Sequence, residues 1–155
     1  MGLPVRLEEF IQELEFLTDQ SSAYINKMTG EIVAATRDEW RMIEDEDLDV
    51  DDLPKWQQPL IERMRAVEQS NDFVALPSKF LIHEWQIMHD FCLSVPPDRL
   101  RNELYDGIHG SGAFRIFKAM IRRHRLEDAW RDFRQQKLEA IAIDFLDKHG
   151  ILWMR

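Results

Sequence analysis

The chain has 155 residues, 45% of them hydrophobic, which is enough to build one domain with a buried core. Its formal net charge of −9 argues against a general affinity for DNA, RNA or anionic membranes. The single cysteine excludes an intrachain disulfide framework, and no apolar run approaches the roughly 18 residues of a membrane span. We therefore predict one soluble, cytoplasmic domain over residues 1–155 that has no membrane association.

The N-terminal part of the chain predicts one helix and a β-hairpin. Apolar residues recur at i, i+3 and i+4 over residues 5–17, which is the spacing of an amphipathic helix. The runs 22–26 and 31–35 flank a short polar loop that ends in Gly30. Because glycine tolerates positive φ at a tight turn, this pattern predicts a hairpin.

An acidic segment follows the predicted hairpin. Residues 38–52 contain nine aspartates or glutamates and one basic residue, Arg41. Such a block repels itself and cannot be buried, so we predict an exposed, mobile loop. Trp40 stands near the start of this segment, where an indole could anchor a protein partner. The alternative for Trp40 is burial against the hairpin.

The remainder of the chain predicts helices with one additional strand. The run 73–76, which ends at Pro77, predicts an edge strand beside the hairpin. Ser78 is predicted to cap a helix that carries a buried Cys92, and Gly150 is predicted to end the last helix. The other helices are predicted over residues 56–67, 97–108, 112–124 and 127–148. The fold class is therefore α+β and predominantly α-helical, with a small N-terminal β-hairpin.

Aromatic residues on the predicted helices share the spacing of their aliphatic neighbours. Core packing is the expected role of such residues, because each of them buries a large apolar area. The residues expected in the core on this basis are Trp56, Trp85, Trp130, Phe114, Phe117 and Phe133.

The run Gly110-Ser111-Gly112 leads directly into the predicted helix 112–124. Backbone N–H groups at a glycine-flanked helix start are free, and with the helix dipole they attract anions. The run lacks the lysine of a Walker loop, the glycine spacing of a dinucleotide fingerprint and the G-x-S-x-G pattern of a hydrolase. The alternative is structural: Ser111 caps the helix and the glycines allow a tight corner.

The helix behind the glycine run has a basic face. At 100° per residue Arg115, Lys118 and Arg122 fall on one side, and residues 115–137 hold eight basic against three acidic residues. A basic stripe beside a free helix N-terminus could hold a phosphate, a nucleotide or an RNA backbone. The alternative is a solvated face whose charge the acidic segment 38–52 compensates. The candidate ligand-binding residues are Gly110, Ser111, Gly112, Arg115, Lys118, Arg122 and Arg123.

Neither a metal site nor a cofactor is predicted. His83-Glu84 resembles the start of a zinc-protease motif, but His89 is six positions beyond His83 and lies on another side of a helix. The acidic segment has no register that supplies both the glycine and the glutamate of a calcium loop. The acidic residues of the predicted helices offer no identifiable acid–base pair, so we predict no catalytic residue.

The order of several short runs resembles a family of small bacterial cytosolic proteins that is catalogued only as an uncharacterised protein family. The resemblance implies a bacterial source and a compact single domain, and it carries no established activity. Ser111 departs from the pattern, in which a basic residue is expected between the two glycines. The runs that carry the resemblance are Tyr24-Ile25-Asn26, Thr29-Gly30-Glu31, Ala75-Leu76-Pro77, Met88, Phe91-Cys92, Gly110-Ser111-Gly112-Ala113-Phe114-Arg115, Phe117, Trp130, Phe133 and residues 145–151.

Three functional interpretations follow from these patterns. The first is a non-enzymatic binding or regulatory module of the bacterial cytosol, in which the acidic segment with Trp40 or the basic helix face docks a protein partner. The second is a module that binds nucleic acid or a phosphate ligand through the glycine run and the basic face. The third is an enzyme of unrecognised type. The oligomeric state does not follow from the sequence.

Overall fold

The computed structural model describes residues 2–78 and 82–155, and this chain divides into two compact units. The first unit holds the described residues up to 78 together with Ala142–Arg155, and the second is Ile82–Ile141. Helices dominate both units and strands occur only in the first, so the predicted α+β fold class is confirmed. The single-domain organisation stays a prediction. None of the helices formed by the described residues combines the length and the apolar character that a membrane crossing requires.

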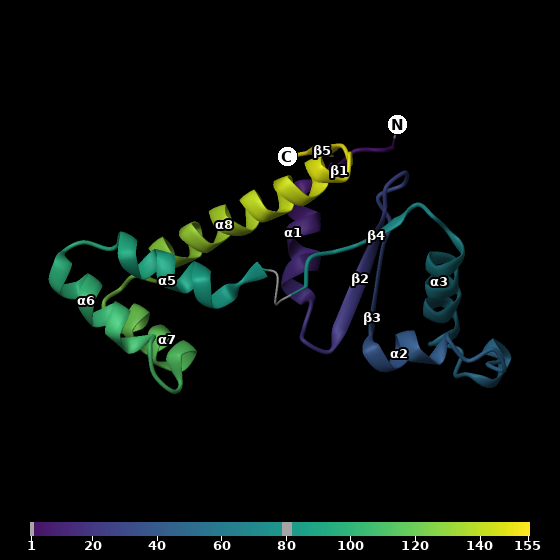
Figure 1. Ribbon diagram of the computed structural model, residues 1–155, viewed down its shortest axis with the longest axis horizontal. Helices are drawn as coiled ribbons and strands as arrows, with labels where there is room; N and C mark the ends of the chain where they lie inside the picture. Colours follow the sequence, from purple (N-terminus) through teal and green to yellow (C-terminus); the bar gives the residue numbers. More distant parts are fainter. Residues whose placement is uncertain (1, 79–81) are drawn as a thin grey trace. The chain divides into compact units, whose positions relative to one another are not determined.

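A three-stranded antiparallel sheet forms the centre of the first unit (Figure 1). It consists of β2 (Ser21–Asn26), β3 (Ile32–Thr36) and β4 (Phe73–Ala75), in the order β3-β2-β4. At the turn between β2 and β3 the Asn26 side chain accepts two backbone N–H bonds, and Gly30 has a φ of +80°. The hairpin and the edge strand were both predicted, and both predictions are confirmed.

Two helices cover the opposite faces of this sheet. Figure 1 shows α1 (Leu7–Phe16) on one side and α3 (Gln58–Gln69) on the other. Alternate residues of β3, among them Val33, pack with the apolar stripe of α3, while Ile25 of β2 is buried on the opposite face of the sheet. The period-2 pattern of the strands thus divides the apolar residues between two helices.

Helix α2 (Arg37–Met42) begins where β3 ends, inside the segment predicted as an acidic loop. Thr36 and Glu39 form a capping box, in which the Thr36 hydroxyl accepts the Glu39 N–H and the Glu39 carboxylate accepts the Thr36 N–H. The loop prediction is therefore wrong for the first part of 38–52, because two capping bonds make the helix start favourable despite the surrounding acids. A short 3₁₀ turn, η1 (Val50–Asp52), ends the segment.

The two ends of the chain meet in a short parallel pair of strands, β1 (Val5–Arg6) and β5 (Trp153–Met154). The predicted helix 5–17 therefore starts two residues later than expected, since residues 5 and 6 pair with a strand from the far end of the sequence. Phe10 of α1 stacks on Phe145 with ring centroids 5.7 Å apart.

The second unit is helical. Its elements are α5 (Glu84–Ser94), α6 (Asp98–Gly107), α7 (Ala113–Arg123) and the first part of α8 (Glu127–Lys148), whose last turns belong to the first unit. The predicted cap at Ser78 leads into residues 79–81, which lie outside the described residues, so it stays a prediction. The core of the second unit consists of Met88, Phe91, Cys92, Val95, Leu104, Ile108, Phe117 and Ile121.

The expected aromatic core is only partly correct. Phe117 is buried, and Trp130 and Phe133 pack against the core of the second unit half-buried. Trp56 is 77% exposed because it precedes α3 instead of lying on its apolar stripe, and Phe114 is 51% exposed on α7. Trp85 at the start of α5 is 37% exposed. For these three residues the core prediction is wrong.

Candidate functional site

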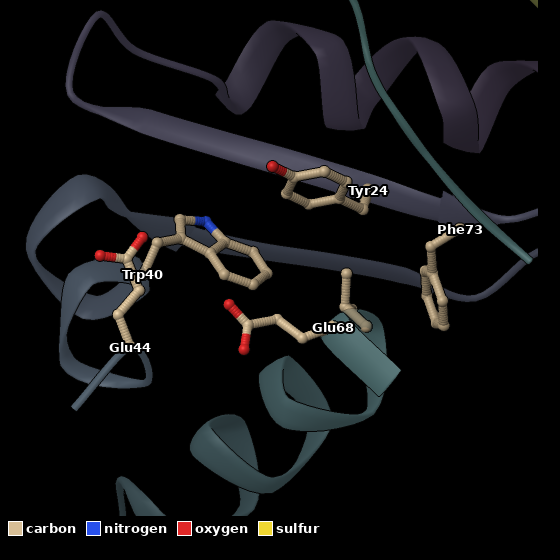
Figure 2. Close-up of a pocket in the computed structure, with 6 residues that line it drawn as sticks. Tyr24, Trp40, Glu44, Glu68 and Phe73 are labelled. Atoms are coloured by element: carbon tan, nitrogen blue, oxygen red, sulfur yellow. The ribbon is translucent and has the colours of Figure 1, made fainter. Parts of the chain in front are cut away.

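The candidate site is a pocket of about 230 Å³ in the first unit, between α2, α3 and the sheet. Figure 2 shows three aromatic rings and two glutamate side chains among the residues that line it. We call it the aromatic pocket. Its lining residues are Tyr24, Trp40, Glu44, Val67, Glu68 and Phe73.

Three aromatic side chains from three different elements form the apolar lining of the aromatic pocket. Tyr24 of β2 and Trp40 of α2 meet edge to face, with ring centroids 5.0 Å apart at an interplanar angle of 73°. The Trp40 indole Nε1 donates a hydrogen bond of 3.2 Å to the backbone carbonyl of Ser22, which fixes the orientation of the ring. Phe73, the first residue of β4, lies beside them half-buried (Figure 2). The expected alternative for Trp40, packing against the hairpin, is therefore confirmed.

Two glutamates supply the polar side of the aromatic pocket. Glu44 follows α2, and Glu68 extends from the last turn of α3 toward the Trp40 ring (Figure 2). Both side chains are exposed, and among the described residues neither has a hydrogen-bond or ion-pair partner. The site therefore combines aromatic faces with two carboxylates that no cation of the described chain neutralises.

The basic residues closest in sequence to these glutamates are engaged elsewhere. Arg63 of α3 pairs with Glu31 at 3.0 Å and donates to the Ile32 carbonyl, while Arg65 donates to the Leu48 carbonyl at 2.8 Å. Arg41 of α2 lies 3.9 Å from Asp38 on the open surface. These contacts leave the aromatic pocket with a local excess of negative charge.

The predicted glycine run lies in the second unit as an exposed turn between α6 and α7. Gly112 is the N-cap of α7 with a φ of +71°, a conformation that favours glycine. Ser111 does not cap the helix, and among the described residues its hydroxyl has no hydrogen-bond partner. The structural alternative is thus correct for the tight corner and wrong for the Ser111 cap.

The basic face of α7 is formed by three of the predicted cations. Arg115, Lys118 and Arg122 line one open depression together with Phe114, whereas Arg123 turns toward Glu103 at 4.0 Å. The Arg115 guanidinium folds back over Gly112, where its nearest nitrogen would lie 3.3 Å from an added Cβ. No acidic residue occupies the first turn of α7. Arg115 and the helix N-terminus therefore present positive potential at the same place.

An aromatic cluster fixes the entry to the glycine run. The His109 ring lies 4.1 Å from the Tyr105 ring, and its Nδ1 donates to the Tyr105 carbonyl at 2.6 Å. The Trp85 ring packs edge-on against His109 and stacks on His89. His109 is thus engaged with α6, and no hydrogen bond between it and Ser111 is present in this described part of the chain. The cluster packs the end of α6 against α5.

No described residues form a metal centre. In residues 2–78 and 82–155, no group of three or more His, Cys, Asp or Glu side chains is placed to hold a metal ion. Glu84, which begins the sequence pattern that resembles a zinc protease, pairs with Arg134 at 2.8 Å.

Cys92 is fully buried in the core of the second unit, as predicted. Desolvation raises the pKa of its thiol from 9.0 to about 11. A backbone hydrogen bond lowers the pKa by a smaller amount. The thiol is therefore protonated at neutral pH, which is the state of a structural cysteine.

The comparisons with known proteins give no relative. No protein-family model, no curated protein and no solved structure matches the chain. The resemblance to a bacterial family stays a prediction, and the functional argument rests on the geometry of this chain.

Sequence reasoning found only part of the aromatic pocket. Trp40 and Glu44 lie in the segment that the sequence singled out, whereas Tyr24, Glu68 and Phe73 were not among the candidates. One signal was available for Glu68, which stands beside the buried Val67 at the edge of the apolar stripe of α3. For Tyr24 and Phe73 no such signal was present in the sequence. Which face of the sheet these strand residues share with the pocket depends on the helix that packs there.

Proposed function

We propose that this chain is a non-enzymatic binding module of the bacterial cytosol that docks a protein partner through a basic segment of that partner. The docking surface is the aromatic pocket together with the acidic residues of segment 38–52, to which the lining residues Trp40 and Glu44 belong. The observation that carries the proposal is the pair Glu44 and Glu68, whose carboxylates stand at an aromatic-lined pocket with no partner among the described residues.

Physical reasons support a macromolecular partner of positive charge. A carboxylate that has no cationic partner in its own chain can form a charge-assisted hydrogen bond with a cation of another protein. That bond is stronger when the interface around it excludes water. Aromatic residues are the commonest anchors of protein interfaces, and here three of them line one pocket together with two glutamates. The net charge of −9 adds long-range attraction for a basic partner and speeds the encounter.

Site-specific photocrosslinking in bacterial cells tests the proposal. A photoreactive amino acid replaces Glu46, an exposed residue of the acidic segment that does not line the aromatic pocket. We expect one dominant protein adduct, whose crosslinked segment is rich in lysine or arginine. The adduct should decrease at least tenfold when Asp45, Asp47 and Asp49 are changed to asparagine.

The matched control places the same photoreactive residue at Glu9, which is exposed on α1. Position 9 should not give the adduct that position 46 gives. Equal adducts at both positions, or an adduct with an acidic segment, would contradict the proposed docking surface.

A second candidate function is supported by the basic face of α7. There Arg115 folds over the N-terminus of the helix, so a guanidinium and free backbone N–H groups converge on one exposed place. This arrangement favours a phosphate, of a small ligand or of a nucleic-acid backbone, held by Gly110, Ser111, Gly112, Arg115, Lys118 and Arg122.

Fluorescence anisotropy of labelled RNA and DNA at low and physiological salt tests this second candidate. We expect salt-sensitive binding that the Arg115→Glu/Lys118→Glu variant loses. The control variant Arg99→Glu/Arg131→Glu removes the same charge from two other exposed sites of the second unit and should bind like the parent. Identical behaviour of the two variants would eliminate α7 as the binding surface.

A further inference from the structure

We infer that the aromatic pocket is a receptor for one arginine side chain of the docked partner. This inference rests on the proposed function and assigns the chemical group that the site recognises. The guanidinium would lie against the Trp40 and Tyr24 rings, with Glu44 and Glu68 accepting its N–H bonds.

The aromatic lining favours a cation over a neutral apolar group. The face of an indole or phenol ring carries negative potential, and indole is the strongest of the natural cation–π partners. Tyr24 and Trp40 meet edge to face, so the two ring planes lie at 73° to each other and not in one stack. The Trp40 ring is held by its bond to the Ser22 carbonyl, so the ring is preorganised before a ligand arrives.

The carboxylates favour a guanidinium over an ammonium. Glu44 follows α2 and Glu68 lies on α3, and a guanidinium has five N–H donors in one plane that can serve two carboxylates at once. It is also more weakly hydrated than an ammonium, so less free energy is lost when aromatic rings replace water. The charge of the site matches this occupant, because among the described residues no cation pairs with either glutamate.

The size of the aromatic pocket favours a side chain over a free small molecule. Pockets that enclose drug-sized ligands measure about 300–1,000 Å³, whereas this one measures about 230 Å³ and opens to the surface. It therefore accommodates the end of a side chain, whose backbone remains outside near the acidic segment.

Isothermal titration calorimetry with three synthetic peptides tests the inference. Each capped nonapeptide has the same lysine-containing flanks and differs only at its centre, which is arginine, lysine or citrulline. Citrulline has nearly the shape of arginine but no charge. We expect the arginine peptide to bind at least tenfold more tightly than the citrulline peptide and at least threefold more tightly than the lysine peptide.

The variant Glu44→Gln/Glu68→Gln should reduce the arginine-to-citrulline ratio to about one. Both glutamates are exposed, so this variant is expected to fold like the parent. The matched control is Glu9→Gln/Glu62→Gln, which removes two exposed glutamates of the first unit that lie outside the docking surface and should keep the ratio. A Trp40→Ala variant should lower the ratio as well, with circular dichroism reporting its fold.

Several results would overturn the inference. Equal binding of the arginine and citrulline peptides, equal binding of the arginine and lysine peptides, or equal loss in the two double variants would each contradict a guanidinium receptor. Binding of free L-argininamide as tight as that of the arginine peptide would replace the protein partner by a small molecule.

Failure of the inference and failure of the proposed function give different results. If all three peptides bind equally and the crosslink at position 46 persists, the docking surface stands without an arginine receptor. If the crosslink is absent while the arginine peptide binds selectively, the receptor stands and the protein-docking function fails.

Discussion

The Trp40 indole Nε1 donates a hydrogen bond of 3.2 Å to the backbone carbonyl of Ser22, which ties helix α2 to strand β2. The bond is partly buried, and it joins the residue that forms one wall of the aromatic pocket to the strand that carries another wall, Tyr24. Stability of the first unit and the shape of the candidate site therefore depend on the same contact.

Replacing Trp40 by phenylalanine should destabilise the first unit. The change leaves the Ser22 carbonyl without its donor, and we expect the free energy of unfolding to fall by about 1–2 kcal/mol. Urea denaturation followed by circular dichroism measures the loss. Trp56→Phe is the control, because Trp56 is exposed and should change stability by less than about 0.5 kcal/mol. Equal losses in the two variants would contradict a structural role for the Trp40 bond.

Removing the capping box should loosen α2. In Thr36→Ala the Glu39 N–H loses its acceptor, and the free energy of unfolding should fall by about 1 kcal/mol. Hydrogen exchange of the Glu39 amide should become faster in the same variant. Thr36→Ser keeps the hydroxyl and should retain most of the stability, so a serine variant as unstable as the alanine variant would argue against the cap.

The ends of α7 and α8 predict opposite effects of glycine. Each helix ends in the same pair of backbone bonds around a left-handed residue, which is Arg125 after α7 and Gly150 after α8. Because a left-handed conformation costs a non-glycine residue about 1–2 kcal/mol, Arg125→Gly should stabilise the chain by roughly 0.5–1 kcal/mol.

Gly150→Ala is the reciprocal change and should destabilise by about 1 kcal/mol. An added Cβ at Gly150 meets nothing within 4 Å, so the loss would report backbone conformation alone. Thermal unfolding of both variants measures the two effects. A destabilised Arg125→Gly protein would show that the Arg125 side chain has a role that outweighs its backbone strain.

The buried thiol of Cys92 predicts a loss of stability at alkaline pH. Burial raises its pKa from 9.0 to about 11, so between these values the unfolded chain releases a proton that the folded chain retains. The stabilisation is therefore complete below about pH 9 and is lost as pH rises toward 11.

Urea titrations across this range, with Cys92→Ala as the reference, isolate the contribution of the thiol. The parent should lose more stability with rising pH than the alanine variant does. Parallel pH profiles would indicate a thiol that ionises normally. At neutral pH the parent should react with a thiol reagent only after denaturant is added.

Local patterns were reliable where one element could be judged by itself. Helix α8 covers Glu127–Lys148, the range predicted from its spacing, and Gly150 follows it in the left-handed conformation. Helix α7 and the hairpin also agree with their predictions within one or two residues. Periodicity and turn chemistry are properties of neighbouring residues, so they are readable before any tertiary contact is known.

Misjudged elements were those in which two local signals competed. The acidic composition of 38–52 predicted a loop, whereas the threonine and glutamate of a capping box, also visible in the sequence, predicted the helix α2 that forms. Trp56 has helical spacing with the stripe of α3, but the helix begins at Gln58, so the indole remains in solvent.

The sequence by itself determined the fold class, the hairpin, most helix ends and the presence of an acidic and a basic surface. Only the tertiary structure decided that Tyr24, Trp40, Glu68 and Phe73 share one pocket. These four residues lie on four different elements. They come together because β2 pairs with β4 and because α2 and α3 pack on the same face of the sheet. Such contacts depend on residues distant in the sequence, so no local spacing encodes them.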